Sequence, residues 1–185
     1  MTRIVVIDPQ PAVRAGLGMM LRTEPGLVPV GAAAGAGDGL KLVSRQRPDV
    51  VVLDGDDLGT CRKLRALDHP PRVVVYAGRE DPALPVAARV AGADGLVSKE
   101  APPSDLYEAI RLVARGESAL PPLDRSQLDA AAHSVEPEDL ALLAMLADRA
   151  EPAEVAATLR LDRRRMARRI ERVLARLRSA SPRPA

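Results

Sequence analysis

Short, continuous apolar runs alternate with helical patterns in the first part of the chain, and this alternation constrains the fold more than any other feature. The clearest run is Val50–Leu53, which is followed directly by Asp54. A run without polar alternation is typical of a strand buried on both faces, as in a parallel sheet. The runs that we expect to be strands are Arg3–Ile7, Leu27–Ala33, Val50–Leu53, Val73–Tyr76 and Gly95–Ser98.

A helical pattern follows each predicted strand. We expect Ser104 to cap the last of these helices, because its hydroxyl can accept a backbone N–H. Strand–helix units repeated in this way form a doubly wound parallel sheet with right-handed crossovers. The sequence therefore predicts an α/β domain with a five-stranded parallel sheet. The predicted helices are Pro11–Arg22, Gly39–Arg47, Thr60–Leu67, Ala83–Ala91 and Ser104–Arg115.

The predicted sheet brings three polar side chains to one edge. Asp8 follows the first strand, Asp54 follows the third and Lys99 follows the fifth. In doubly wound sheets, ligands bind outside the carboxyl ends of the strands, where these residues lie. One acid at a strand end is ordinarily a solvated turn residue, but two acids and a lysine together indicate a chemical site.

The segment Leu161–Leu177 predicts an amphipathic helix with a cationic face, which Asp162 can cap. Arginine recurs at steps of three and four on one side of this helix. A cationic helix suits a polyanion and fits the major groove of DNA. The alternative is a solvated, arginine-rich surface helix. The apolar stripe on the other side consists of Met166, Ile170, Val173, Leu174 and Leu177.

Two further helices precede this cationic one. We expect helices at Pro137–Arg149, Pro152–Leu159 and Asp162–Arg178, and only Arg160 and Leu161 separate the last two. A short turn between two amphipathic helices is typical of a helix-turn-helix, whose second helix enters the major groove. The predicted domains are a sheet domain at 1–117, a linker at 118–133, a helix-turn-helix domain at 134–179 and a disordered tail at 180–185.

Composition argues against several other classes of protein. The net charge is only +2, so the positive charge is local, concentrated between Arg160 and Arg178. No nucleophile–base pair is recognisable, and His69 and His133 lie in a predicted loop and linker, so we do not expect an enzyme. The single Cys61 excludes an intramolecular disulfide. The chain shows neither a signal peptide nor a run of about 18 apolar residues, so we expect a cytoplasmic protein without a membrane span.

Four long segments resemble two-component response regulators of the NarL/FixJ subfamily. They are VVIDPQPAVRAGL, RPDVVVLD, AGADGLVSKEAPPSDLYEAIRLVARGE and VEPEDLALLAMLADRAEPAEVAATLRLDRRRMARRIERVLARL, and the similarity extends over residues 3–178. The resemblance implies a receiver domain with a flavodoxin-like fold, followed by a LuxR-type helix-turn-helix. It places Asp54 at the phosphoacceptor position and Lys99 at the family's lysine. It also implies a histidine kinase and double-stranded DNA as partners.

The receiver part departs from the family pattern at its acidic pocket. The family has two adjacent acids after the first strand, which hold Mg²⁺ together with the acceptor, but here the pair is Asp8-Pro9. Ala77 stands where the family has a hydroxyl residue. We expect no cofactor, and Mg²⁺ at most weakly bound by Asp8 and Asp54. The alternative is that Asp56 or its neighbour Asp57 replaces the missing acid and that the pocket is phosphorylated in the usual way.

The DNA-binding part also departs from the pattern. Arg149 replaces the usual turn glycine, and Arg165-Met166-Ala167 replaces Thr-Val-Lys. The family's final helix, which commonly supports dimerisation, has no counterpart after Arg178, so we expect any homodimer to form through the receiver domain.

The predicted function is that of a DNA-binding transcriptional regulator with a degenerate receiver domain. Two alternatives remain: a phosphorylation-switched regulator, and an interaction module that has lost DNA binding and titrates another regulator. The predicted DNA contacts are Arg163, Arg164, Arg165, Arg168, Arg169 and Arg172, and the predicted acidic pocket is Asp8, Asp54, Asp56 and Lys99.

Overall fold

The computed structural model describes residues 1–78 and 81–180, which form two compact units. Of the described residues, the first unit comprises 1–78 and 93–120, and the second comprises 81–92 and 121–180. Among the described residues, no helix is long and apolar enough to cross a bilayer.

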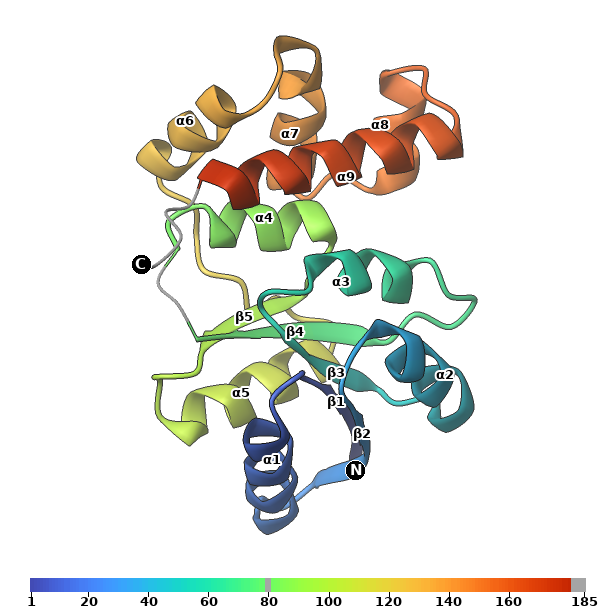
Figure 1. Cartoon of the computed structure of the whole chain (residues 1–185), viewed down its shortest axis with the longest axis vertical. Helices are drawn as coiled ribbons and strands as arrows, with labels where there is room; N and C mark the ends of the chain where they lie inside the picture. Colours follow the sequence, from blue (N-terminus) through green and yellow to red (C-terminus); the bar gives the residue numbers. More distant parts are fainter. Residues whose placement is uncertain (79–80, 181–185) are drawn as a thin grey trace. The chain divides into compact units, whose positions relative to one another are not determined.

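The first unit contains a parallel sheet with the strand order β2-β1-β3-β4-β5 (Figure 1). All pairings between neighbouring strands are parallel, as predicted. The order reverses between β1 and β3, so their carboxyl ends flank the topological switch point, where such sheets bind ligands. The strands are β1 (Thr2–Ile7), β2 (Leu27–Ala33), β3 (Val50–Asp54), β4 (Arg72–Ala77) and β5 (Gly95–Ser98).

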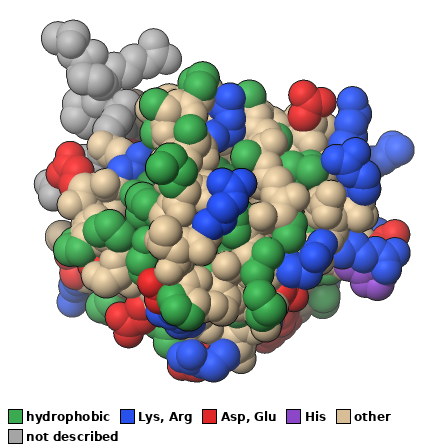
Figure 2. Space-filling model, turned by 90° about the horizontal axis from the view of Figure 1, so that it is seen from below, with side chains coloured by type: hydrophobic (Ala, Val, Ile, Leu, Met, Phe, Trp, Pro, Cys, Tyr) green, Lys and Arg blue, Asp and Glu red, His purple; other side chains and the backbone are tan. Residues whose placement is uncertain are grey.

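Helices cover both faces of this sheet. Figure 1 shows α1 (Pro11–Thr23) and α5 (Pro103–Ala114) on one side, with α2 (Ala36–Gln46) and α3 (Leu58–Arg65) on the other. Every residue of β3 is buried, because its side chains point alternately to the two covered faces. On the surface in Figure 2, basic, acidic and apolar side chains are interspersed, in keeping with the small net charge.

The second unit is helical. Its helices are α4 (Leu84–Ala91), α6 (Arg125–Ser134), the short 3-10 helix η1 (Pro137–Asp139), α7 (Leu140–Ala147), α8 (Pro152–Thr158) and α9 (Arg163–Ala180). The apolar stripe predicted for α9 is buried throughout: Met166, Ile170, Val173, Leu174 and Leu177.

Both turns around α8 contain a residue with left-handed backbone. Arg149, at the position of the family's turn glycine, has a φ of 64°, and Arg160 has a φ of 52°. A residue with a Cβ adopts this conformation at a cost of about 1 kcal/mol. We infer that the packing of the flanking helices offsets this cost at Arg149 and Arg160.

The structure adds detail to two predicted segment boundaries and contradicts one predicted helix cap. The predicted linker 118–133 contains most of α6, which begins with a capping box between Asp124 and Gln127. Ser104 does not cap α5, because it lies inside the first turn and its hydroxyl donates to Asp105 instead. The boundary predicted for the tail, residue 180, falls inside α9, which ends at Ala180, and residues 181–185 lie outside the described part.

Strands β3 and β4 remain close just beyond the end of β3, and this predicts a specific effect of Gly55→Ala. A Cβ at Gly55 would lie 2.7 Å from the Ala77 Cβ and 3.0 Å from its Cα. We expect the substitution to lower the free energy of unfolding by about 1–3 kcal/mol, because neither atom belongs to a flexible side chain. Denaturant unfolding measures this change.

Gly59→Ala is the matched control, since the nearest atom to its added Cβ is an Asp57 carboxylate oxygen at 3.8 Å. It should leave stability unchanged or raise it by up to about 1 kcal/mol, because alanine favours helix more than glycine does. Equal destabilisation by the two substitutions would contradict the close-approach explanation.

Candidate functional site

Lys99 joins the two acids at the carboxyl edge of the sheet. Its Nζ lies 2.7 Å from the Asp8 Oδ2 and 2.6 Å from the Asp54 Oδ1. The three residues come from the ends of β1, β3 and β5, and the parallel topology brings these ends to one edge. The predicted convergence of Asp8, Asp54 and Lys99 is therefore present in the structure.

Each carboxylate also receives a backbone donor. The Gln10 N–H donates to the Asp8 Oδ1 at 2.8 Å, and the Asp56 N–H donates to the Asp54 Oδ2 at 3.2 Å. Together with Lys99, these bonds provide a donor for all four oxygens of Asp8 and Asp54. Buried carboxylates need such partners, and the exposed fraction of the Asp8 side chain is only 2%.

Burial and pairing change the acidity of this cluster. Burial raises the pKa of the Asp54 carboxyl above its ordinary value, and the neighbouring Lys99 offsets part of that rise. Burial acts to lower the pKa of the Lys99 ammonium, but its hydrogen bonds to Asp54 and Asp8 raise that pKa above the ordinary value. Lys99 is therefore charged at neutral pH and acts as the internal counter-ion of this pocket.

Two residues of β4 complete the surroundings of Lys99. The Lys99 Nζ lies 5.8 Å from the centre of the Tyr76 ring, a cation–π distance, and the Lys99 N–H donates to the Ala77 carbonyl at 2.7 Å. Ala77 is buried and offers no hydroxyl at the end of β4. Tyr76 is not among the residues predicted for this pocket, although its place directly before Ala77 on a predicted strand was a usable signal.

The two other acidic residues near this pocket, Asp56 and Asp57, differ in their surroundings. Asp57 caps α3, because its side chain accepts from the Thr60 N–H and hydroxyl at 3.1 and 2.5 Å. The Asp56 residue is exposed. Among the described residues, no cluster of three or more acidic, histidine or cysteine side chains could hold a metal. Lys99 provides the positive charge between Asp8 and Asp54.

The predicted cationic helix α9 is capped as expected. The Asp162 Oδ1 accepts the Arg165 N–H at 2.8 Å, and the Asp162 carboxylate also lies 3.6 Å from the Arg165 Nε. Arg163, Arg164 and Arg168 are exposed, and the described residues include no acid within ion-pair distance of them. The first half of α9 therefore presents a positively charged surface to solvent.

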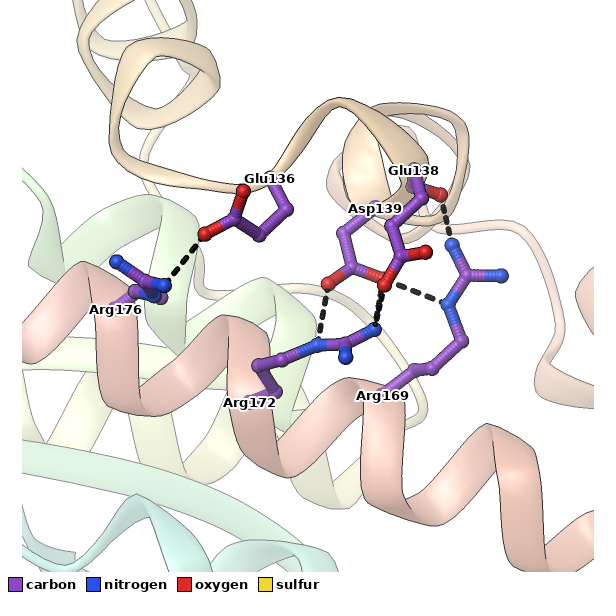
Figure 3. A network of polar contacts seen from close by, with 6 residues as sticks. All are labelled: Glu136, Glu138, Asp139, Arg169, Arg172 and Arg176. Carbon is purple, nitrogen blue, oxygen red and sulfur yellow. Dashed lines mark hydrogen bonds and ion pairs between the residues drawn. The ribbon is translucent and has the colours of Figure 1, made fainter.

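Farther along α9, a short acidic segment neutralises the next arginines (Figure 3). Asp139 accepts from the Arg169 Nε at 2.6 Å and from the Arg172 Nε at 2.8 Å. Arg172 also pairs with Glu138 at 2.6 Å, and Arg176 pairs with Glu136. The structure thus holds Arg169 and Arg172, two of the predicted DNA contacts, in pairs within the second unit. The role of Asp139 was not predicted, although the acidic run from Glu136 to Asp139 was visible in the sequence.

Asp139 is the buried centre of this network, which predicts its effect on stability. The exposed fraction of its side chain is 1%, against 19% for Arg169 and 43% for Arg172. We expect Asp139→Asn to lower the free energy of unfolding by about 3 kcal/mol, the lower end of the range for breaking a buried ion pair, because Arg172 is partly solvated. Glu136→Gln, which breaks an exposed pair, should cost less than about 1 kcal/mol. Equal losses in denaturant unfolding would contradict this assignment.

The network also predicts how stability depends on pH. Burial acts to raise the pKa of Asp139, but the hydrogen bonds from Arg172 and Arg169 outweigh it and hold that pKa below its ordinary value of 3.8. The stability contributed by Asp139 is therefore complete above the unfolded-state pKa and is lost as the pH falls through the lower folded-state pKa. The stability difference between the parent and Asp139→Asn should be constant from pH 7 to about pH 5 and shrink below about pH 4. A difference that grows on acidification would contradict this pairing.

Comparison with known proteins identifies the family. The model of the response regulator receiver domain matches residues 4–111. The nitrate/nitrite response regulator protein NarL of Escherichia coli is 32% identical over 122 residues, which cover 63% of this chain and 56% of that protein. The chain thus spans little more than half the length of this relative. Response regulator RamR of Streptomyces coelicolor is 35% identical over 170 residues, which cover 88% of this chain and 83% of that protein.

Solved structures agree in fold. RcsB from Salmonella enterica serovar Typhimurium, solved bound to promoter P1flhDC, aligns with a TM-score of 0.62 over 95% of this chain and 91% of that chain, at 16% identity. Similarity at this identity concerns the fold alone, whereas the receiver match and the RamR alignment concern the family. The chain therefore belongs to the response regulators, and it is of the NarL/FixJ type.

Proposed function

We propose that the chain is a DNA-binding transcriptional regulator whose receiver domain is not switched by conventional aspartyl phosphorylation. The observation that carries the DNA-binding part is the exposed start of α9, where Arg163, Arg164 and Arg168 have no acidic side chain within ion-pair distance among the described residues. Arginine binds a phosphate, or a guanine edge with two hydrogen bonds. The promoter complex of RcsB, a protein of the same fold, supports this proposal.

The receiver part of the proposal rests on the pocket around Lys99. Phosphoryl transfer depends on positioning and on neutralising the charge of the moving group. Here Lys99 is engaged by both acids, Pro9 contributes neither a carboxylate nor a backbone donor, and Ala77 offers no hydroxyl to a phosphoryl group. We infer that the Asp8–Lys99–Asp54 pairing holds the receiver in one conformation.

Partners follow from the same proposal. Double-stranded DNA is the ligand of α9, and we place the protein in the cytoplasm with it. We propose that a homodimer, if one forms, is held together by the receiver helices α1 and α5. A histidine kinase would be a partner only if Asp54 were phosphorylated, which we do not expect.

One observation favours a second function, that of an interaction module that titrates another regulator. In a helix-turn-helix complex the first helix crosses the DNA backbone. Here α8 begins with the exposed acids Glu151 and Glu154, which would oppose phosphate groups. Selection from a random DNA pool separates the two functions, because a titrating module would enrich no sequence.

We predict that two arginines of α9 account for much of the DNA affinity. The double variant Arg164→Ala and Arg168→Ala should bind the selected duplex more weakly, with a log–log salt slope reduced by about two, one for each phosphate that is no longer bound. The matched control is Lys41→Ala with Arg45→Ala, which removes the same charge from exposed positions of α2. Equal binding by the two double variants at several salt concentrations would contradict the proposal.

We also predict that Asp54 does not act as a phosphorylation switch. Incubation with a small-molecule phosphodonor and Mg²⁺ should leave the intact mass unchanged, because Pro9 lacks a carboxylate and Ala77 lacks a hydroxyl. The parent and Asp54→Asn should bind DNA with equal affinity. Stoichiometric phosphorylation that raises DNA affinity, and that Asp54→Asn abolishes, would establish the conventional switch instead.

A further inference from the structure

We propose that Asp139 is a positioning residue for the DNA-binding helix α9: it withdraws Arg169 and Arg172 from DNA and thereby turns Arg164 and Arg168 toward it. This inference rests on the proposed DNA-binding function and divides the predicted DNA-binding arginines into those that hold the helix and those that bind the ligand. The division separates neighbours in sequence, since Arg168 and Arg169 are adjacent.

These two adjacent arginines differ in their surroundings. Arg168 is exposed and has no acidic partner within ion-pair distance in the described part of the chain. The Arg169 side chain is only 19% exposed, and besides Asp139 it donates to the Glu138 carbonyl. The guanidinium group of Arg169 is therefore engaged inside the unit, whereas that of Arg168 reaches solvent.

Release of the paired arginines would be costly. Asp139 is 1% exposed and uses both carboxylate oxygens: Arg169 binds Oδ1, and Arg172 binds Oδ2 at 2.8 Å and Oδ1 at 3.2 Å. For either arginine to bind a phosphate through the Nε and Nη2 edge of its guanidinium group, it would have to leave Asp139. Removing the cation from a buried carboxylate strongly destabilises the folded protein. Contacts of the released arginine with DNA would first have to offset this loss, so they would add little to the binding free energy.

The geometry of the network also fixes the orientation of α9. Asp139 ends η1, just before α7, and binds α9 at two positions one turn apart. Two such attachments fix the rotation of α9 about its own axis. Successive residues of an α-helix are about 100° apart, so Arg168 faces about 100° away from Arg169 and about 40° away from Arg172. Arg164, one turn before Arg168, faces about 40° farther from both paired arginines. Figure 3 shows the paired arginines side by side along α9, all directed toward the acidic segment.

The decisive comparison is between Arg168→Ala and Arg169→Ala in the full chain, using a duplex selected from a random pool. Arg168→Ala should reduce the log–log salt slope by about one and leave the Tm unchanged. Arg169→Ala should lower the Tm and, measured well below it, leave the salt slope unchanged. Arg169→Lys, which keeps the charge, serves if Arg169→Ala does not fold. A slope reduction by the Arg169 variant equal to that of Arg168→Ala would overturn the division.

A second readout tests positioning apart from stability. Asp139→Asn should reduce the discrimination between the selected duplex and one with a substituted base pair, by about tenfold if one base is no longer recognised, while non-specific affinity persists. A purely structural role would lower both affinities in the same proportion, by reducing the folded fraction. A folded Asp139→Asn protein with unchanged discrimination would therefore refute the positioning role.

Failure of the inference and failure of the proposed function give different results. If the parent enriches no sequence and binds DNA no better than Arg164→Ala with Arg168→Ala, the DNA-binding function itself is wrong and the inference falls with it. If the parent binds selectively but the Arg168 and Arg169 variants behave alike, only the inference is wrong.

Discussion

Both units of this protein are arranged around the cost of burying a carboxylate. A buried acid without partners loses hydration worth several kcal/mol, so it must be paired and hydrogen-bonded. Asp8, Asp54, Asp94 and Asp139 are all buried, and each lies against a basic side chain. The pairs join segments that are distant in sequence, so the same interactions that satisfy these acids also connect the elements of each unit.

In the receiver domain, the partners of the buried carboxylates come from the chain itself. Lys99, from the end of β5, satisfies the acids that follow β1 and end β3, and the ring of Tyr76 lies beside it. Every oxygen of these two carboxylates therefore has a donor from within the chain. The proposed absence of a phosphorylation switch rests on this pairing together with Pro9 and Ala77.

In the helical unit, the need to pair buried acids divides the arginines of α9 into two groups. Those near the acidic segment Glu136–Asp139 neutralise it, and those at the start of the helix remain in solvent. A count of arginines therefore overstates the charge that a DNA duplex would meet. The small net charge of the chain agrees with this view, because most of its basic residues are balanced by acids.

The order of strands and helices, the burial of the central strands on both faces, and the meeting of Asp8, Asp54 and Lys99 were determined by the sequence alone. These features follow from local hydrophobic periodicity and from the fact that parallel strands end at the same edge of a sheet. The Asp162 cap and the buried stripe of α9 were equally readable, since they depend on neighbours within one helix. The capping box of α6 is also a local feature, since it joins Asp124 and Gln127.

Only the tertiary structure decided the roles of Asp139, Asp57 and Tyr76. Residues 139 and 169 are far apart in the chain, so whether their side chains meet depends on the position of η1 beside α9 and on the rotation of that helix. Periodicity assigns Arg168 and Arg169 to an exposed cationic surface without telling which one has an acid opposite it. That distinction depends on the distance between side chains, which exists only once the helices have packed.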